Sequence, residues 1–211
     1  MTDEEAVSLD LLERAAIRKR ARNVALAAVV VGAACGGIVG LFFGPLGFFI
    51  TGGVLALPLL LLAYGDSRKT YWLRGTELAA RAFGTRVVDL RTARRMDVLV
   101  TDLRGMRTVS LLVSGPPKGK ALNIAVAMYA GTGGKELGVY SLRRLADALA
   151  SIGDTRALVL SDLLVAQLKS EARGDAAAER PLYRLASLAP QGRMAQTLRS
   201  DDVARFVTSL G

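Results

Sequence analysis

The most restrictive feature of this sequence is a long uncharged run. Residues 23–65, 43 in all, contain no Asp, Glu, Lys or Arg, and about 30 of them are apolar. A membrane-spanning helix needs about 20 apolar residues, so the run has room for two. The tetrapeptide Gly44-Pro45-Leu46-Gly47 lies in its middle, where proline breaks a helix and glycine permits a reversal. We therefore expect a transmembrane hairpin over 23–65, with helices at 24–43 and 48–64; a buried helix pair in a soluble protein is the alternative.

Basic residues on both sides of the run predict its orientation. Arg14, Arg18, Lys19, Arg20 and Arg22 precede it, Arg68, Lys69 and Arg74 follow it, and the turn has no charge. Basic flanks stay in the cytoplasm. We therefore expect a multi-pass protein of the cytoplasmic (inner) membrane with both termini in the cytoplasm.

Residues 1–22 are acidic at the start and basic at the end, which suits the dipole of a helix. We expect a cytoplasmic N-terminal helix that leads into the first membrane helix. Its basic end supplies candidates for contact with anionic lipid head groups, namely Arg18, Lys19, Arg20 and Arg22. The alternative is that these residues only determine topology.

Four glycines recur every fourth residue of the first membrane helix: Gly32, Gly36, Gly40 and Gly44. Residues at this spacing share one helix face, where a second backbone can approach closely. The face predicts either a glycine zipper that makes a homo-oligomer or small pore, or packing against the second helix of the same chain. A transporter or proton pump is disfavoured because the hairpin has no ionisable Asp, Glu, Lys or Arg.

From Tyr71 to Tyr140 the sequence pattern changes to a period of two, which is typical of half-buried antiparallel strands. Apolar positions alternate in five segments, 78–82, 86–90, 96–101, 109–113 and 122–128, and a further strand is expected at 136–140. A helix follows, with Ser141 as its N-cap and one apolar stripe through Leu142, Leu145 and Leu149. The fold class predicted is α+β: the membrane hairpin, then a β-rich domain closed by a helix.

This order of strands and closing helix resembles the bacterial pleckstrin-homology-like (PH-like) fold. The segment Trp72–Leu78, together with Arg81 and Arg86–Leu90, resembles small actinobacterial integral membrane proteins of unknown function. The resemblance covers about residues 70–151 and implies membrane helices joined to a PH-like cytoplasmic domain. It brings no catalytic motif.

The remaining residues, 154–211, are predicted to be a helical segment. Asp154 or Thr155 begins a helix that ends near Ala172, residues 174–178 form a loop, and 180–189 form a short helix. Ser200 begins the final helix. We expect these helices to pack on the sheet or on each other.

Several kinds of chemistry are excluded by composition. The chain has no histidine and one cysteine, which rules out Ser-His-Asp and Cys-His catalysis, Cys₄ zinc sites and an internal disulfide. The segment 115–121 departs from a phosphate-binding loop in spacing and in the residue after its lysine. Asp89, Asp97 and Asp102 show no pairing signal. We expect no catalytic residues, no metal and no cofactor.

The chain has a net charge of +9, and several of its basic residues cluster around loops within residues 70–151. Arg91, Arg94, Arg95, Lys118 and Lys120, with Arg104 and Arg107 nearby in sequence, are candidates for head-group contact; a solvated basic face is the alternative. Nucleic acid is not expected, since exposed aromatic residues are scarce. The expected function is a non-enzymatic integral membrane protein whose cytoplasmic PH-like domain binds a lipid or an unknown cytoplasmic protein. The alternative is the homo-oligomeric assembly or pore.

Overall fold

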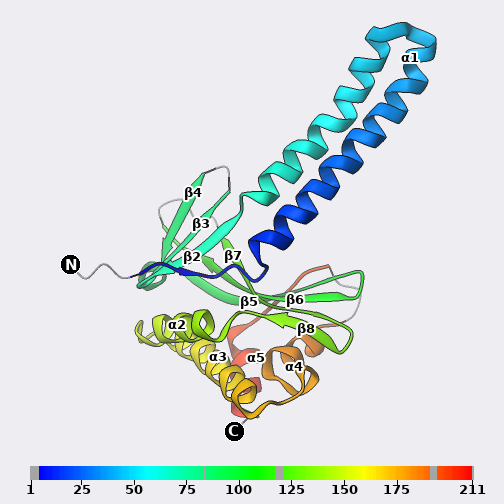
Figure 1. The fold of residues 1–211 in the computed structure, drawn as a ribbon. Coiled ribbons are helices and arrows are strands. Elements are labelled where there is room, and N and C mark those ends of the chain that lie inside the picture. Colours follow the sequence, from blue (N-terminus) through cyan, green and yellow to red (C-terminus); the bar gives the residue numbers. More distant parts are fainter. Residues whose placement is uncertain (1–4, 83, 117–120, 191–193, 211) are drawn as a thin grey trace. The chain divides into compact units, whose positions relative to one another are not determined.

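The computed structural model describes residues 5–82, 84–116, 121–190 and 194–210. The predicted α+β class is confirmed: one long apolar helix is combined with two antiparallel sheets and C-terminal helices (Figure 1). The chain forms two compact units. One, called the β domain below, comprises the residues up to Leu11, Thr70–Ala80 and those from Thr85 onward; the other comprises Leu12–Lys69 and Arg81–Gly84.

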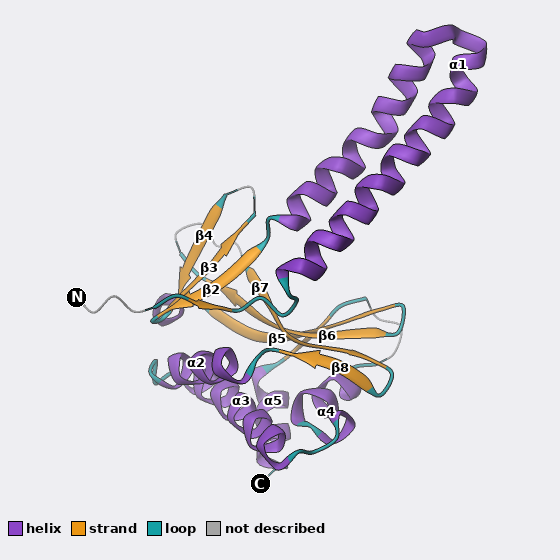
Figure 2. Ribbon diagram, viewed as in Figure 1, coloured by secondary structure: helices purple, strands orange, loops and turns teal. Residues whose placement is uncertain are grey.

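The long apolar helix, α1, extends over Arg14–Ser67 and leaves helical geometry at Gly44, where φ is 69° and ψ is −167°. The residues before and after Gly44 are called the first and second arms of α1, and the two arms run side by side (Figures 1 and 2). The break falls on the first residue of the predicted turn. Pro45 directly follows the break and therefore lies at the start of the second arm. Proline is tolerated at the start of a helix, because the backbone N–H groups of the first turn have no hydrogen-bond acceptor within the helix.

The predicted N-terminal helix is wrong for the described residues before Arg14. Val7–Ser8 instead form strand β1, which pairs antiparallel with β2 (Thr70–Arg74) in the register Val7 to Leu73 and Ser8 to Trp72. Leu9 continues the pairing through its N–H, which donates to the Tyr71 carbonyl at 2.9 Å. Val7 and Leu9 are 5% and 1% exposed, so burial in the β domain outweighs local helix propensity.

The β domain contains two antiparallel sheets. The first has the order β1-β2-β3-β4, with β3 at Glu77–Arg81 and β4 at Thr85–Asp89, and the 3-10 helix η1 (Leu90–Thr92) follows β4. The second has the order β8-β7-β6-β5-β9. Its strands are β5 (Arg95–Leu103), β6 (Met106–Ser114), β7 (Leu122–Ala130), β8 (Gly133–Glu136) and β9 (Gln196–Leu198).

Three details of the strand prediction need correction. β2 was not expected as a strand, and the strand expected at 136–140 lies instead at Gly133–Glu136. β9 interrupts the segment 154–211 that was expected to be entirely helical, and it pairs antiparallel with β5. A three-residue strand has too short a pattern to be recognised without its partner.

The helices after the sheets are α2 (Val139–Ala150), α3 (Thr155–Arg173), α4 (Pro181–Leu188) and α5 (Ser200–Thr208), with the 3-10 helix η2 (Ala177–Glu179) before α4. Ser141 does not cap α2, whose N-cap is Gly138. The Ser141 hydroxyl donates instead to the Ser8 carbonyl at 2.7 Å. This bond ties α2 to β1.

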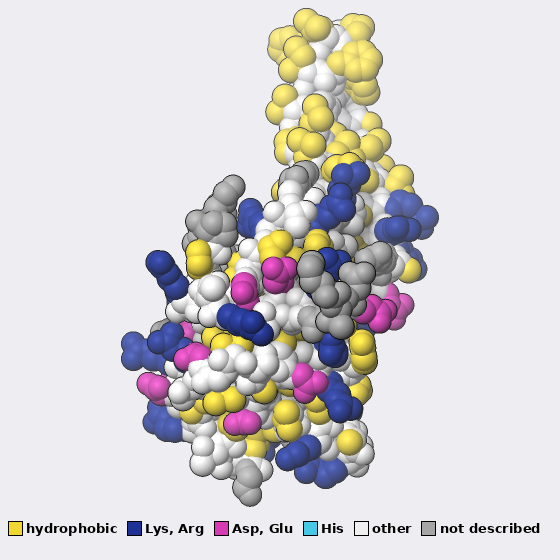
Figure 3. Space-filling model, turned by 90° about the vertical axis from the view of Figure 1, so that its left-hand side faces the viewer, with side chains coloured by type: hydrophobic (Ala, Val, Ile, Leu, Met, Phe, Trp, Pro, Cys, Tyr) yellow, Lys and Arg dark blue, Asp and Glu magenta, His cyan; other side chains and the backbone are white. Residues whose placement is uncertain are grey.

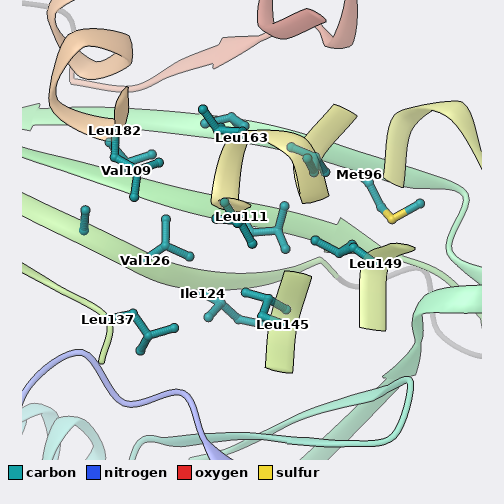
Figure 4. Close-up of a cluster of buried hydrophobic side chains, with 14 of the residues drawn as sticks. Met96, Val109, Leu111, Ile124, Val126, Leu137, Leu145, Leu149, Leu163 and Leu182 are labelled. Atoms are coloured by element: carbon teal, nitrogen blue, oxygen red, sulfur yellow. The ribbon is translucent and has the colours of Figure 1, made fainter. Parts of the chain in front are cut away.

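The core of the β domain lies between the second sheet and the helices that cover it (Figure 4). Leu111 and Ile124 from β6 and β7 face Leu145 and Leu149 from α2, together with Leu163 from α3. These five side chains are at most 4% exposed. The apolar residues that alternate along the strands therefore pack against the apolar stripe of α2 in one core.

The β5–β6 turn contains a backbone conformation that its sequence disfavours. Arg104 and Gly105 have φ values of 55° and 78°, and they join strands paired at Leu103 and Met106. A two-residue turn with positive φ at both positions favours asparagine or glycine at the first. Arg104→Asn should therefore raise the free energy of unfolding of the β domain by about 1 kcal/mol. Thermal denaturation of both proteins measures the difference, and a lower melting temperature for the variant would contradict the reasoning.

Candidate membrane anchor and charged sites

The surface of α1 is apolar along most of its length. Apolar side chains cover it on the face shown in Figure 3, and only 17% of its most apolar 18-residue window is buried. Leu41, Phe42 and Phe43, just before the break, are 86%, 80% and 77% exposed. Exposed apolar surface on this scale is costly in water. α1 is thus long and apolar enough to cross a membrane.

Basic side chains mark the ends of α1 that lie away from the break at Gly44. Arg18, Lys19, Arg20 and Arg22 are all exposed on the first arm. On the second arm, the Arg68 guanidinium lies 4.6 Å from the centre of the Tyr64 ring. The guanidinium lies over the aromatic ring, so this end of the second arm carries a cation–π contact.

Three of the four predicted zipper glycines face the second arm of the same chain. A Cβ added at Gly36 would lie 2.7 Å from the Phe48 carbonyl oxygen, and one added at Gly40 would lie 3.1 Å from the Phe48 Cβ. A Cβ added at Gly32 would lie 3.0 Å from the Gly52 carbonyl oxygen. Gly44 is the residue at the break, and a Cβ added there would meet no atom within 4 Å. The glycines thus allow the close approach of the two arms.

The described basic residues that were predicted to contact lipid head groups from the β domain fall into two groups. Arg91 in η1, Arg94 just before β5 and Arg95 at the start of β5 are exposed and close in the chain. Arg156, at the start of α3, joins them, since its Nη1 donates to the Arg94 carbonyl at 3.3 Å. Sequence reasoning missed Arg156 because 62 residues separate it from Arg94. Lys118 and Lys120 lie outside the described residues.

Arg104 and Arg107 belong to the second group, at the opposite end of β5 from Arg95. β5 has nine residues, so its ends are about 27 Å apart at the rise of a strand. The five described residues of the basic set grouped by sequence therefore do not form one site.

The three aspartates considered as possible acid–base groups have structural roles. Asp89 Oδ1 accepts from the Arg91 backbone N–H and from the Thr76 hydroxyl, both at 3.0 Å. Asp97 pairs with Arg95, and Asp102 pairs with Arg107. Among the described residues, no three His, Cys, Asp or Glu side chains gather as a metal site would require.

A partly buried polar network was not foreseen from the sequence. The Tyr129 hydroxyl donates to Glu136 Oε1 at 2.6 Å, and Arg180 Nη1 donates to Glu136 Oε2 at 2.5 Å. Burial and the bond to Glu136 raise the pKa of Tyr129, while the bond to Glu136 raises the pKa of Arg180. Tyr129 therefore remains a protonated donor, and the network joins β7 and β8 to the segment before α4.

No protein-family model, curated protein or solved structure matches this chain.

Proposed function

We propose that this chain is a non-enzymatic integral protein of a bacterial cytoplasmic membrane. α1 inserts as a transmembrane hairpin, and the β domain stays on the cytoplasmic side to bind a lipid or protein partner. The observation that carries the proposal is the pairing of β1 with β2, because these strands lie on opposite sides of α1 in the sequence.

The pairing of β1 with β2 limits the ways in which α1 can cross a membrane. A sheet cannot form across a bilayer, because its hydrogen-bonding strands lie within about 5 Å of each other. Besides the strand register, the Tyr71 N–H donates to Asp10 Oδ1 at 2.8 Å. The pairing therefore supports a chain that enters and leaves the membrane on the same face, so that α1 crosses it an even number of times. The basic residues at that face support a cytoplasmic location.

The dimensions of α1 favour two full crossings. The uncharged part of the first arm from Val24 to Phe43 has 20 residues, which span about 30 Å and match the hydrocarbon core of a bilayer. Gly44 breaks the helix and leaves backbone groups without helical partners, and such groups are costly in hydrocarbon. The break therefore lies at the far interface, with the exposed phenylalanines beside it among lipid tails.

The PH-like assignment of the β domain is part of the proposal. It is supported by the run of seven strands from β2 to β8, followed directly by α2, in two antiparallel sheets. β1 and β9 add one edge strand to each sheet. A fold of this kind does not determine a function, which depends on the charged surfaces that the domain carries.

Anionic lipid should protect the group formed by Arg91, Arg94, Arg95 and Arg156. Each basic residue near an anionic surface contributes about 1 kcal/mol of attraction. With the full chain in nanodiscs, amide hydrogen exchange of residues 90–96 should slow several-fold when neutral lipid is replaced by a mixture with anionic lipid. High salt should reverse the effect because it screens the charges. Equal exchange in both lipids would show that this face is only solvated.

The homo-oligomer or pore gains no specific support. Three of the four glycines that suggested it face the second arm within the same chain, and the fourth, Gly44, is the break.

A further inference from the structure

A cleft in the β domain lies far from the arginine group near η1. It has a volume of about 650 Å³ and lies among the β5–β6 turn, the β7–β8 turn and α4. This volume is within the range of small-molecule sites, which is roughly 300–1,000 Å³. The cleft is thus large enough for an organic ligand of modest size.

Arg107 lines the cleft with an incompletely used guanidinium. Its Nε donates to Asp102 Oδ2 and its Nη1 to the Ala186 carbonyl, both at 3.4 Å. These bonds are long, and they use two of the five donors of an arginine. The side chain is only 20% exposed. A carboxylate or phosphate could take the remaining donors in a partly desolvated position, where charged hydrogen bonds are strong.

Arg104 supplies a second cation to the lining. It occupies the positive-φ position of the turn, with φ 55°, although asparagine or glycine would be favoured there. Strained residues cluster at functional sites. Arg104 and Arg107 face one carboxylate among the lining residues, that of Asp102, so the cleft favours an anion.

Aromatic and apolar groups supply another part of the wall, beside Ser187 and the glycines of the two turns. The rings of Tyr129 and Tyr183 make an edge-to-face pair with centres 5.1 Å apart. The Tyr183 hydroxyl donates to the Gly131 carbonyl at 3.2 Å, which holds this ring across the β7–β8 turn. Met194, which is 76% exposed, also lines the cleft. These groups fit a flat apolar body.

We propose that this cleft binds a small organic anion, with a phosphate or carboxylate on Arg107 and Arg104 and a flat apolar body against Tyr183 and Met194. The site is separate from the proposed lipid-contact surface and does not depend on the proposed function.

The test uses phenyl phosphate and the full chain in nonionic detergent, with ¹³C-labelled methionine methyl groups. The Met194 methyl signal should shift saturably below about 10 mM, as expected for a small fragment. The signal of Met96, which is buried at the other end of β5, should not move. Benzyl alcohol, which has the ring without the charge, should give no saturable shift.

Variants separate binding from stability. Arg107→Gln should weaken binding by at least about tenfold, the effect of one charged hydrogen bond. Arg104→Asn should weaken it several-fold while melting no lower than the original chain, so its loss cannot be attributed to unfolding. Arg143→Asn, on the exposed face of α2, removes the same charge and should leave binding within twofold. No saturable shift with phenyl phosphate, equal binding by Arg104→Asn, or an equal shift with benzyl alcohol would overturn the proposal.

Discussion

Replacing Gly36 with alanine should lower the stability of α1 by about 1–3 kcal/mol, the range for inserting a methyl group into a packed site. The new Cβ would lie 2.7 Å from the Phe48 carbonyl oxygen and 3.3 Å from its ring. A rotamer change cannot relieve the first contact, because the carbonyl belongs to the backbone. The two arms must therefore move apart where Gly36 lies against Phe48.

Gly37 provides the matched control, because a Cβ there meets no atom within 4 Å. Gly37→Ala changes helix propensity without adding a close contact. Because alanine favours the helix more than glycine does, this variant should not be less stable than the original chain. Thermal unfolding of the full chain in detergent compares the two variants. Electron spin labels at Ile38 and Ile50, both exposed, should move apart only in the Gly36 variant. Identical behaviour of the two variants would mean that the arms do not pack through this glycine.

Removing the Glu136 side chain should have the largest effect in the β domain. Glu136→Ala is expected to lower the free energy of unfolding by about 3 kcal/mol, the low end for breaking a buried ion pair. The side chains of Glu136 and Arg180 are only 9% and 23% exposed. The change leaves the Arg180 cation and the Tyr129 hydroxyl without their common acceptor.

An exposed ion pair in α5 provides the comparison. Arg205 pairs with Asp202, and their side chains are 80% and 49% exposed. Arg205→Gln should cost less than about 1 kcal/mol, because water screens such pairs. Scanning calorimetry of the full chain measures both variants. A similar loss of unfolding free energy in the two variants would show that the Glu136 network contributes no more to stability than a surface ion pair.

Patterns within one segment allowed much of the fold to be predicted. The alternation of Met96, Val98 and Val100 indicated β5, and the stripe through Leu142, Leu145 and Leu149 indicated α2. These patterns are readable because burial imposes a period of 2 or 3.6 on the sequence. Gly44-Pro45 marked the break in α1 for a similarly local reason.

Features that depend on distant partners could not be predicted. Val7–Ser8 form a strand only because β2 lies beside them, more than 60 residues later. The Glu136–Arg180 ion pair joins residues 44 positions apart. The length of β5 separates Arg95 from Arg104, although both lie in one basic stretch of sequence. Such juxtapositions follow from topology rather than from local residue type.

The most direct test of the account is the side of the membrane reached by the two ends of α1. Single cysteines are introduced at Glu5, Glu77 and Leu46, all in a chain with Cys35→Ala, and intact cells are treated with a membrane-impermeant maleimide. Glu5 and Glu77 should be labelled only after permeabilisation, and Leu46, beside the break, should be labelled in intact cells. If Glu5 and Glu77 are labelled from opposite sides of the membrane, α1 crosses an odd number of times and the β1–β2 pairing cannot exist in the cell.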